Sequence, residues 1–340
     1  METEYLIVDE YGAFVGKHSE RLQVRKGDAV LKEVPLLHLE GVIISDRGVS
    51  LSADAIAACA EAGIPIHFVH FAGHVSASIF SAGLTGTVQT RRAQLAAYDD
   101  RRGVLLAKAF ALGKISNQAA LIRYLAKYRK ETQPELHRDL VRRAEGIMTC
   151  AAELETLPGD HAEEIRERLL SAEGRAAERY WQAVRAVVNV PADWPGRTGR
   201  GATDAVNAAL NYGYGILYSQ TERAIVLAGL DPYAGFIHAD RPGKPSLVLD
   251  LVEEFRAPAV DRTIFAMINR GTKLEIDADN LLVKETRRAI AENVLERLDK
   301  PEQHARKKMA LRHILQSQAR QIATFVRGER ESYQPFLARW

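Results

Sequence analysis

Residues 235–256 read GFIHADRPGKPSLVLDLVEEFR, and the interpretation of the whole chain starts from this stretch. One imidazole, His238, precedes a tight Pro/Gly turn, and an apolar segment typical of a buried helix follows. Asp250 and Glu253 stand three positions apart on that segment and therefore share one helix face. Because the turn can bring His238 back beside them, one nitrogen and two carboxylates can converge. Such a donor set suits a hard divalent cation such as Mg²⁺ or Mn²⁺.

Outward from this stretch, the second part of the chain has the 3.6-residue period of amphipathic helices. The pattern covers residues 89–131, 135–154, 160–188, 201–229, 246–269 and 284–327. Proline and glycine separate these segments, as at Pro134 and at Pro158 with Gly159. We therefore expect an all-α-helical domain around the candidate site.

The first part of the chain is rich in strand formers instead. Short runs at 5–9, 13–16, 21–25 and 42–45 are punctuated by glycines, which predicts β-strands. One short helix is expected between Ser52, a suitable N-cap, and Gly63. The fold class is thus α+β. It comprises a β-sandwich-like domain at 1–85, a linker at 86–90, a helical domain at 91–328, and a tail at 329–340 that is mobile or docks on a partner.

Composition sets broad limits on function. A length of 340 residues suggests two domains. The net charge is only +2, so nucleic-acid binding would depend on local clusters of basic residues. The two cysteines, Cys59 and Cys150, stand in apolar surroundings typical of reduced core thiols. No run reaches the ~20 apolar residues of a membrane helix, and we expect a cytoplasmic protein.

Four segments together resemble the CRISPR-associated endonuclease and integrase of spacer acquisition. Residues 235–256 form one of them. Residues 171–181, SAEGRAAERYW, resemble the family's first metal-ligand helix, and residues 203–218 resemble its asparagine-bearing core helix. Residues 49–52 and 62–68 resemble its β-domain. No single motif is decisive, but their order and spacing agree over nearly the whole chain.

The resemblance implies a set of catalytic residues. Glu173, His238 and Glu253 fall on the family's metal ligands. Asp250 is then an acid that orients or tunes a ligand, or else a helix carboxylate with a local hydrogen bond. Asn207 matches the core-helix asparagine, which implies a role near the scissile phosphate, unless its amide simply holds helices together.

Basic residues are locally clustered and suggest a face for duplex DNA. The selected candidates are Arg91, Arg92, Lys114, Arg197, Arg200 and Arg256. Any one of them alone is explained as a solvated surface charge, but together they suit phosphate binding. Lys114, with Asn117 and Gln118, resembles the family's Lys-Ile-x-Asn-Gln motif.

The resemblance implies an enzyme that inserts short DNA segments, or spacers, into a CRISPR array for antiviral defence. A DNA 3′-hydroxyl attacks a phosphodiester of the repeat, with Mg²⁺ or Mn²⁺ as cofactor. The implied partners are double-stranded DNA (spacer precursor and repeat), a second copy bound through the β-domain, CRISPR-associated protein two in a heterohexamer, and optionally a trimming nuclease. Two alternatives stay open: a metal-dependent phosphodiesterase acting on other nucleic-acid or small substrates, and a non-enzymatic DNA-binding dimer.

Overall fold

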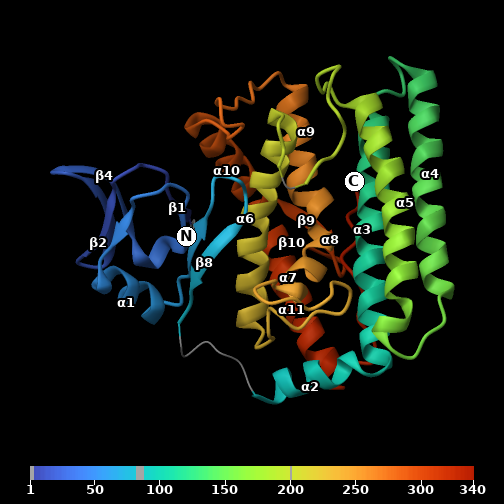
Figure 1. Ribbon diagram of the computed structural model, residues 1–340, viewed down its shortest axis with the longest axis horizontal. Coiled ribbons are helices and arrows are strands. Elements are labelled where there is room, and N and C mark those ends of the chain that lie inside the picture. The colour runs from blue at the N-terminus through green and yellow to red at the C-terminus, as the bar shows by residue number, and fades with distance from the viewer. Residues whose placement is uncertain (1–3, 82–87, 200) are drawn as a thin grey trace.

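A computed structural model describes residues 4–81, 88–199 and 201–340 of the chain (Figure 1). A smaller β-rich domain forms from the N-terminal residues and a larger, mostly helical domain from the rest, which confirms the predicted fold class. One buried apolar cluster fills the β-rich domain. A second runs through the helical domain and extends to Tyr5, Ile43 and Val69 of the first domain. The two domains therefore share an apolar contact.

Two four-stranded sheets make up most of the N-terminal domain. The first has the order β1 (Glu4–Val8), β5 (Leu39–Ile44), β7 (Ile66–Val69) and β8 (Val75–Ile79). The second has the order β4 (Ala29–Pro35), β3 (Arg21–Lys26), β2 (Phe14–His18) and β6 (Ser50–Leu51), and a short 3-10 helix, η1 (Leu36–His38), precedes β5. β5 runs parallel to both β1 and β7, whereas β8 is antiparallel to β7.

The predicted short helix is α1 (Ala53–Glu61). Its N-cap is Ser52, whose Oγ accepts a hydrogen bond from the amide of Ala55 at 3.1 Å. Beyond the C-terminus Gly63 has φ 69°, a conformation that favours glycine. Both predicted ends of this helix are confirmed. Cys59 on this helix is buried and unpaired, as is Cys150 in the second domain.

Three long helices, α3 (Arg101–Lys127), α4 (Pro134–Thr156) and α5 (Ala162–Val187), pack side by side in the part of the helical domain farthest from the β-rich domain (Figure 1). The helix before them is α2 (Val88–Tyr98), and the helix after them is α6 (Ala205–Leu227). The carboxylate of Asp100 accepts a hydrogen bond from the amide of Arg102 at 2.8 Å and caps the N-terminus of α3. The segment predicted at 89–131 is therefore divided into two helices, α2 and α3. α6 contacts β7 and β8 and joins the two domains.

The segment predicted as one helix over 246–269 is broken. It consists of α7 (Ser246–Leu251), α8 (Glu253–Phe255), the π-helical turn η3 (Arg256–Asp261) and α9 (Arg262–Asn269). Pro258 lies inside the π-helical turn, and proline lacks the amide hydrogen that a regular α-helix needs at that position. The break places Glu253 at the beginning of its own helical turn.

The prediction of a helix over 284–327 is wrong, and the second domain is not wholly helical. The segment forms α10 (Lys284–Asp299), β9 (Pro301–His304), β10 (Lys307–Ala310) and α11 (Leu311–Val326). Pro301 begins an antiparallel hairpin whose two turn residues, Ala305 and Arg306, both have positive φ (46° and 65°). Two successive positive φ angles are typical of the tight hairpin turn that suits twisted strands.

The C-terminal tail is packed within the chain, so the prediction that it is mobile or docks on a partner is wrong for its last residues. Phe336 is fully buried and stacks on Phe255, with ring centroids 5.3 Å apart. The Asn117 side chain on α3 bonds to the backbone of Phe336 and of Ala338, each at 2.8 Å. Apolar burial and paired backbone groups together hold the tail.

Two further expectations concern the linker between the domains and membrane-spanning helices. The predicted linker at 86–90 lies partly outside the described residues, and α2 already begins at Val88. Among the described helices, none combines the length and the apolar character needed to cross a membrane.

Candidate metal centre

Two carboxylates from different helices meet at one cationic side chain. Glu173 belongs to α5, Glu253 to α8 and Lys114 to α3. Lys114 Nζ lies 2.5 Å from Glu173 Oε1 and 2.7 Å from Glu253 Oε2. The structure therefore brings together two of the three predicted ligands, which are far apart in sequence.

Burial shapes the electrostatics of this group. The side chains of Lys114 and Glu253 are only 11% and 3% exposed. Burial acts to raise the pKa of Glu253, but Arg256, Lys114 and His238 outweigh it and hold the pKa below its ordinary value. Burial acts to lower the pKa of Lys114, and Glu253 and Glu173 overcome it, so this pKa is raised. Both groups therefore carry their charges at neutral pH.

The third predicted ligand, His238, is held by Asp250, which is fully buried on α7. Asp250 Oδ2 accepts the amides of Phe236 and Ile237 at 2.5 and 3.0 Å. Asp250 Oδ1 accepts the amide of His238 at 3.1 Å and lies 2.7 Å from its Nδ1. Nδ1 then carries the hydrogen, and Nε2 keeps a lone pair. This geometry supports the interpretation of Asp250 as the acid that orients a ligand.

The donor set fits a hard divalent cation, although the three ligands do not enclose one as they stand. Among residues 4–81, 88–199 and 201–340, no three acidic, histidine or cysteine side chains are close enough to hold an ion. The ammonium of Lys114 lies between the two carboxylates instead. Glu173 Oε2 is buried with no hydrogen-bond partner among the described residues, so it remains available to a cation. Carboxylate oxygens and one imidazole are ligands that Mg²⁺ or Mn²⁺ accepts.

Asn207 is a positioning residue in this structure. It is fully buried at the beginning of α6, and its Oδ1 accepts the amide of Thr198 at 2.9 Å. Its Nδ2 donates to Gly196 O at 2.8 Å and to Asp204 Oδ2 at 2.7 Å. These bonds occupy the amide, and the role of Asn207 near the scissile phosphate stays a prediction. The alternative interpretation, an amide that holds structural elements together, agrees with the structure.

A groove of about 1490 Å³ runs between the two domains. It is bordered by residues 71–78, by α6 and by the loop before α7. Among its lining residues are Arg197, Tyr214, Tyr218, Arg241, Lys244 and Arg256. The guanidinium carbons of Arg197 and Arg256 lie 5.4 and 4.8 Å from the centre of the Tyr214 ring. Stacked on one ring, they line the same wall of the groove.

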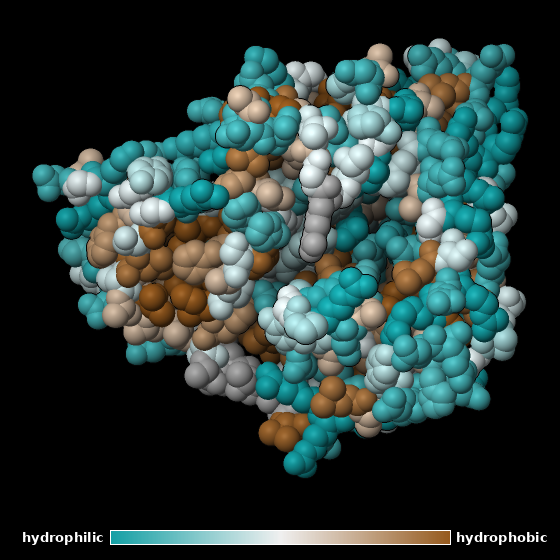
Figure 2. Space-filling view, in the orientation of Figure 1, coloured by the Kyte–Doolittle hydropathy of each residue, from teal (hydrophilic) through white to brown (hydrophobic). Residues whose placement is uncertain are grey.

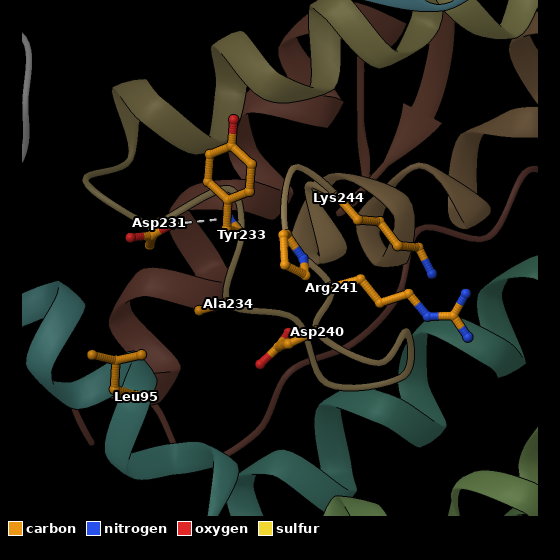
Figure 3. A pocket seen from close by; sticks show the side chains of 8 residues that line it. Leu95, Asp231, Tyr233, Ala234, Asp240, Arg241 and Lys244 are labelled. Atoms are coloured by element: carbon orange, nitrogen blue, oxygen red, sulfur yellow. Dashed lines mark hydrogen bonds between the residues drawn. The ribbon is translucent and has the colours of Figure 1, made fainter.

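Two basic residues of this groove escaped the sequence analysis. Figure 3 shows Arg241 and Lys244 extending in the same direction from the loop between His238 and α7. Both also line a smaller pocket of about 390 Å³ together with Leu95 and Asp231. The signal was present in the sequence Asp-Arg-Pro-Gly-Lys, because Pro-Gly is typical of a turn and turns usually lie at the surface.

Comparison with known proteins then decides the family. Residues 6–296 match the family described as CRISPR associated protein Cas1. The CRISPR-associated endonuclease Cas1 1 of Archaeoglobus fulgidus is 37% identical over 98% of this chain and 99% of its own length. That of Francisella tularensis subsp. novicida is 33% identical over 99% of this chain and 100% of its own.

The chain belongs to the Cas1 family. It is therefore a nuclease-class enzyme, as its curated relatives are. Two solved structures have the same fold. A casposase bound to integration product gives a TM-score of 0.81 at 22% identity, over 98% of this chain and 93% of that one. A CAS1 protein from Thermotoga maritima gives 0.77 at 18% identity, over 98% and 100%.

The remaining predicted DNA contacts of this Cas1 chain have different outcomes. Lys114 faces the two carboxylates rather than the groove, so the prediction that it contacts DNA is not supported by its position here. Arg91 and Arg92 lie on α2 and do not line the groove in the described part of the chain. Arg200 lies outside the described residues.

Proposed function

We propose that this chain is a metal-dependent DNA endonuclease and integrase that inserts spacers into a CRISPR array. One observation carries the proposal: Glu173 and Glu253 converge on a single cation, Lys114. His238 is oriented by Asp250, which leaves its Nε2 free to donate to a metal. Arg256, which contacts Glu253, also lines the groove, and with Arg197 it presents guanidinium groups there, which suits the phosphates of DNA.

Glu173, His238 and Glu253 would hold Mg²⁺ or Mn²⁺, through carboxylate oxygens and the Nε2 of the imidazole. When bound, the cation stabilises the negative charge that develops on the phosphodiester and aligns the attacking and leaving oxygens. In strand transfer, a 3′-hydroxyl replaces one strand end of the repeat at phosphorus. A new phosphodiester forms as the old one breaks, and no covalent bond to the protein is needed.

The other groups of the site act on binding and orientation. Asp250 fixes the tautomer of His238, so that Nε2 stays a donor to a metal. Arg197 and Arg256 present charge to the groove, and their contacts with backbone phosphates carry no sequence information. Asn207 holds residues 196–198 against α6 and so keeps Arg197 at the groove wall.

For its partners, we propose a homodimer and a complex with CRISPR-associated protein two. Figure 2 shows apolar residues gathered on one face of the N-terminal domain. Among the described residues of this domain, five large apolar side chains are exposed: Tyr11, Phe14, Val30, Leu31 and Leu37. Such a patch is typical of an interface, so residues 1–85 would form the dimer and 91–328 the catalytic domain. A Cas6-RT-Cas1–Cas2 complex includes a chain of similar fold (TM-score 0.77, 21% identity). The similarity covers 99% of the present chain and 36% of the chain in that complex. The heterohexamer, a docked trimming nuclease and a cytoplasmic location are parts of this proposal.

The test is to replace the three proposed ligands one at a time, with isosteric glutamine at the two glutamates. Glu173→Gln and Glu253→Gln should abolish nicking and strand transfer in the presence of Mn²⁺, as should His238→Ala, while circular dichroism stays unchanged. The matched control is Glu178→Gln, because Glu178 lies on the same helix as Glu173 but is exposed. Full activity in any of the three ligand variants would refute the assigned site.

A second measurement separates this proposal from its alternatives. Affinity for duplex or branched DNA should fall steeply with added salt, because released counter-ions contribute to binding. A phosphodiesterase for small substrates would show no such affinity. A non-enzymatic DNA-binding dimer would bind DNA without stoichiometric Mn²⁺ binding.

A further inference from the structure

Lys114 occupies an unusual place for a lysine. Its side chain is 11% exposed, and its ammonium bridges two carboxylates that come from different helices. The distances of 2.5 and 2.7 Å put the charge directly between the oxygens that the proposed function assigns to a metal. A lysine that merely braced α3 against one neighbour would need a single partner.

The charges of this cluster balance without a metal. Glu173 and Glu253 contribute two negative charges, whereas Lys114 and Arg256, whose Nη1 lies 3.3 Å from Glu253 Oε1, contribute two positive charges. Asp250 adds one further negative charge, which three backbone amides and His238 solvate. A divalent cation that entered the cluster would therefore add more positive charge than this remaining carboxylate can neutralise, in a poorly solvated place.

We propose that Lys114 is an internal counter-ion of the metal centre. In the metal-free protein its ammonium takes the place of the divalent cation between Glu173 and Glu253, keeps the two carboxylates from repelling each other, and opposes metal binding. The inference rests on the proposed function, because the carboxylates paired with Lys114 are the proposed ligands. The inference adds a role for Lys114, which opposes metal binding in the metal-free protein.

A coupling between metal and DNA follows from this charge balance. Phosphates in the groove bring the negative charge that the metal-loaded cluster lacks, so DNA should strengthen metal binding. By linkage, the metal must strengthen DNA binding by the same factor. Lys114 would thus keep the metal affinity of the site low until DNA binds.

The test measures metal binding rather than catalysis. Mn²⁺ binding to the full chain is followed by calorimetry, without DNA, in the wild type and in Lys114→Met. Removal of one charge a few Å from the ion should tighten Mn²⁺ binding by about tenfold or more. The matched control is Lys108→Met on the same helix, because among the described residues the ammonium of Lys108 donates to the carbonyls of Glu155 and Leu157 and should not affect the metal.

A second measurement does not depend on the folding of that variant. The wild type is titrated with Mn²⁺ in the presence and absence of a duplex whose strands lack 3′-hydroxyls. The duplex should tighten Mn²⁺ binding by about tenfold. In Lys114→Met, if it folds, the duplex should have a smaller effect, because the opposing charge is already gone.

The results of these measurements distinguish failure of the counter-ion role from failure of the proposed function. Unchanged or weaker Mn²⁺ binding in Lys114→Met, or no effect of the duplex on the wild type, overturns the counter-ion role and leaves the metal site standing. Absence of Mn²⁺ binding in the wild type with and without the duplex, and also in Lys114→Met, removes the proposed function and this inference together.

Discussion

Asp250→Asn is the substitution from which the structure gives the clearest quantitative expectation. The buried carboxylate of Asp250 accepts four donors, two at each oxygen. Oδ2 takes the amides of Phe236 and Ile237, and Oδ1 takes the amide and the ring Nδ1–H of His238. Asparagine has the same shape but only one accepting oxygen, because its second terminal atom is a donor.

The magnitude follows from counting these donors. If the NH₂ group faces Phe236 and Ile237, two buried amides lose their acceptor. If it faces His238, the amide of His238 loses its acceptor, while the ring can take its other tautomer and accept from the NH₂ group. An unsatisfied buried donor costs about 1–3 kcal/mol, so the free energy of unfolding should fall by about 1–6 kcal/mol. Without a carboxylate the tautomer of His238 is no longer fixed, and affinity for Mn²⁺ should fall by about 10–100-fold.

Urea unfolding measures the stability change, and calorimetry measures the change in Mn²⁺ affinity. The control is Asp277→Asn, because in that exposed turn a single oxygen, Oδ1, accepts the amides of Asp279 and Leu281 at 2.9 and 3.0 Å. Asparagine can provide the same oxygen there, so the change should stay within about 0.5 kcal/mol. Equal effects of the two substitutions would show that the donor count at Asp250 does not govern its role.

Two other predictions concern stability away from the metal ligands. Burial first, and then the charge of Arg223, lower the pKa of His67 from 6.5 to about 3. The unfolded chain therefore binds a proton between those pH values that the folded chain does not, and stability is lost as the pH falls through this window, by up to roughly 5 kcal/mol. In His67→Gln the unfolding free energy should depend less on pH below 6.5, and identical acid-side slopes in urea titrations would contradict this. Tyr333→Phe removes a hydroxyl that donates to the buried carboxylate of Glu254 and should lower stability by about 1–2 kcal/mol. Tyr233→Phe, at an exposed position, should leave the urea midpoint unchanged, and an equal loss in both variants would rule out the tail contact as the cause.

Local features of the sequence predicted much of the secondary structure. Ser52 and Gly63 mark the ends of α1, because a cap and a positive φ are properties of single residues and their neighbours. The helical period likewise located α3 to α6. The hairpin of β9 and β10 was missed, because its residues continue the polar and apolar spacing of the flanking helices, and only the proline at 301 interrupts them.

The site itself was predictable only in part. The order of motifs selected Glu173, His238 and Glu253, and the spacing to Asp250 pointed to an acid beside the histidine. The roles of Asn207 and Lys114 were not predictable in the same way. The amide of Asn207 is occupied by Gly196, Thr198 and Asp204, and no local pattern in the sequence predicts the contacts with Gly196 and Thr198.

By itself, the sequence located most of the strands and helices, though not the β9–β10 hairpin. It also indicated which family the chain resembles and which side chains are candidate metal ligands. All of these depend on residues near one another along the chain, or on motifs in a fixed order. The tertiary structure alone decided that Lys114 lies between two carboxylates, one of them 59 residues away in sequence. Packing of α3 against α5 and α8 sets that arrangement, because distances of a few Å between helices arise from burial of their apolar faces and from no local signal.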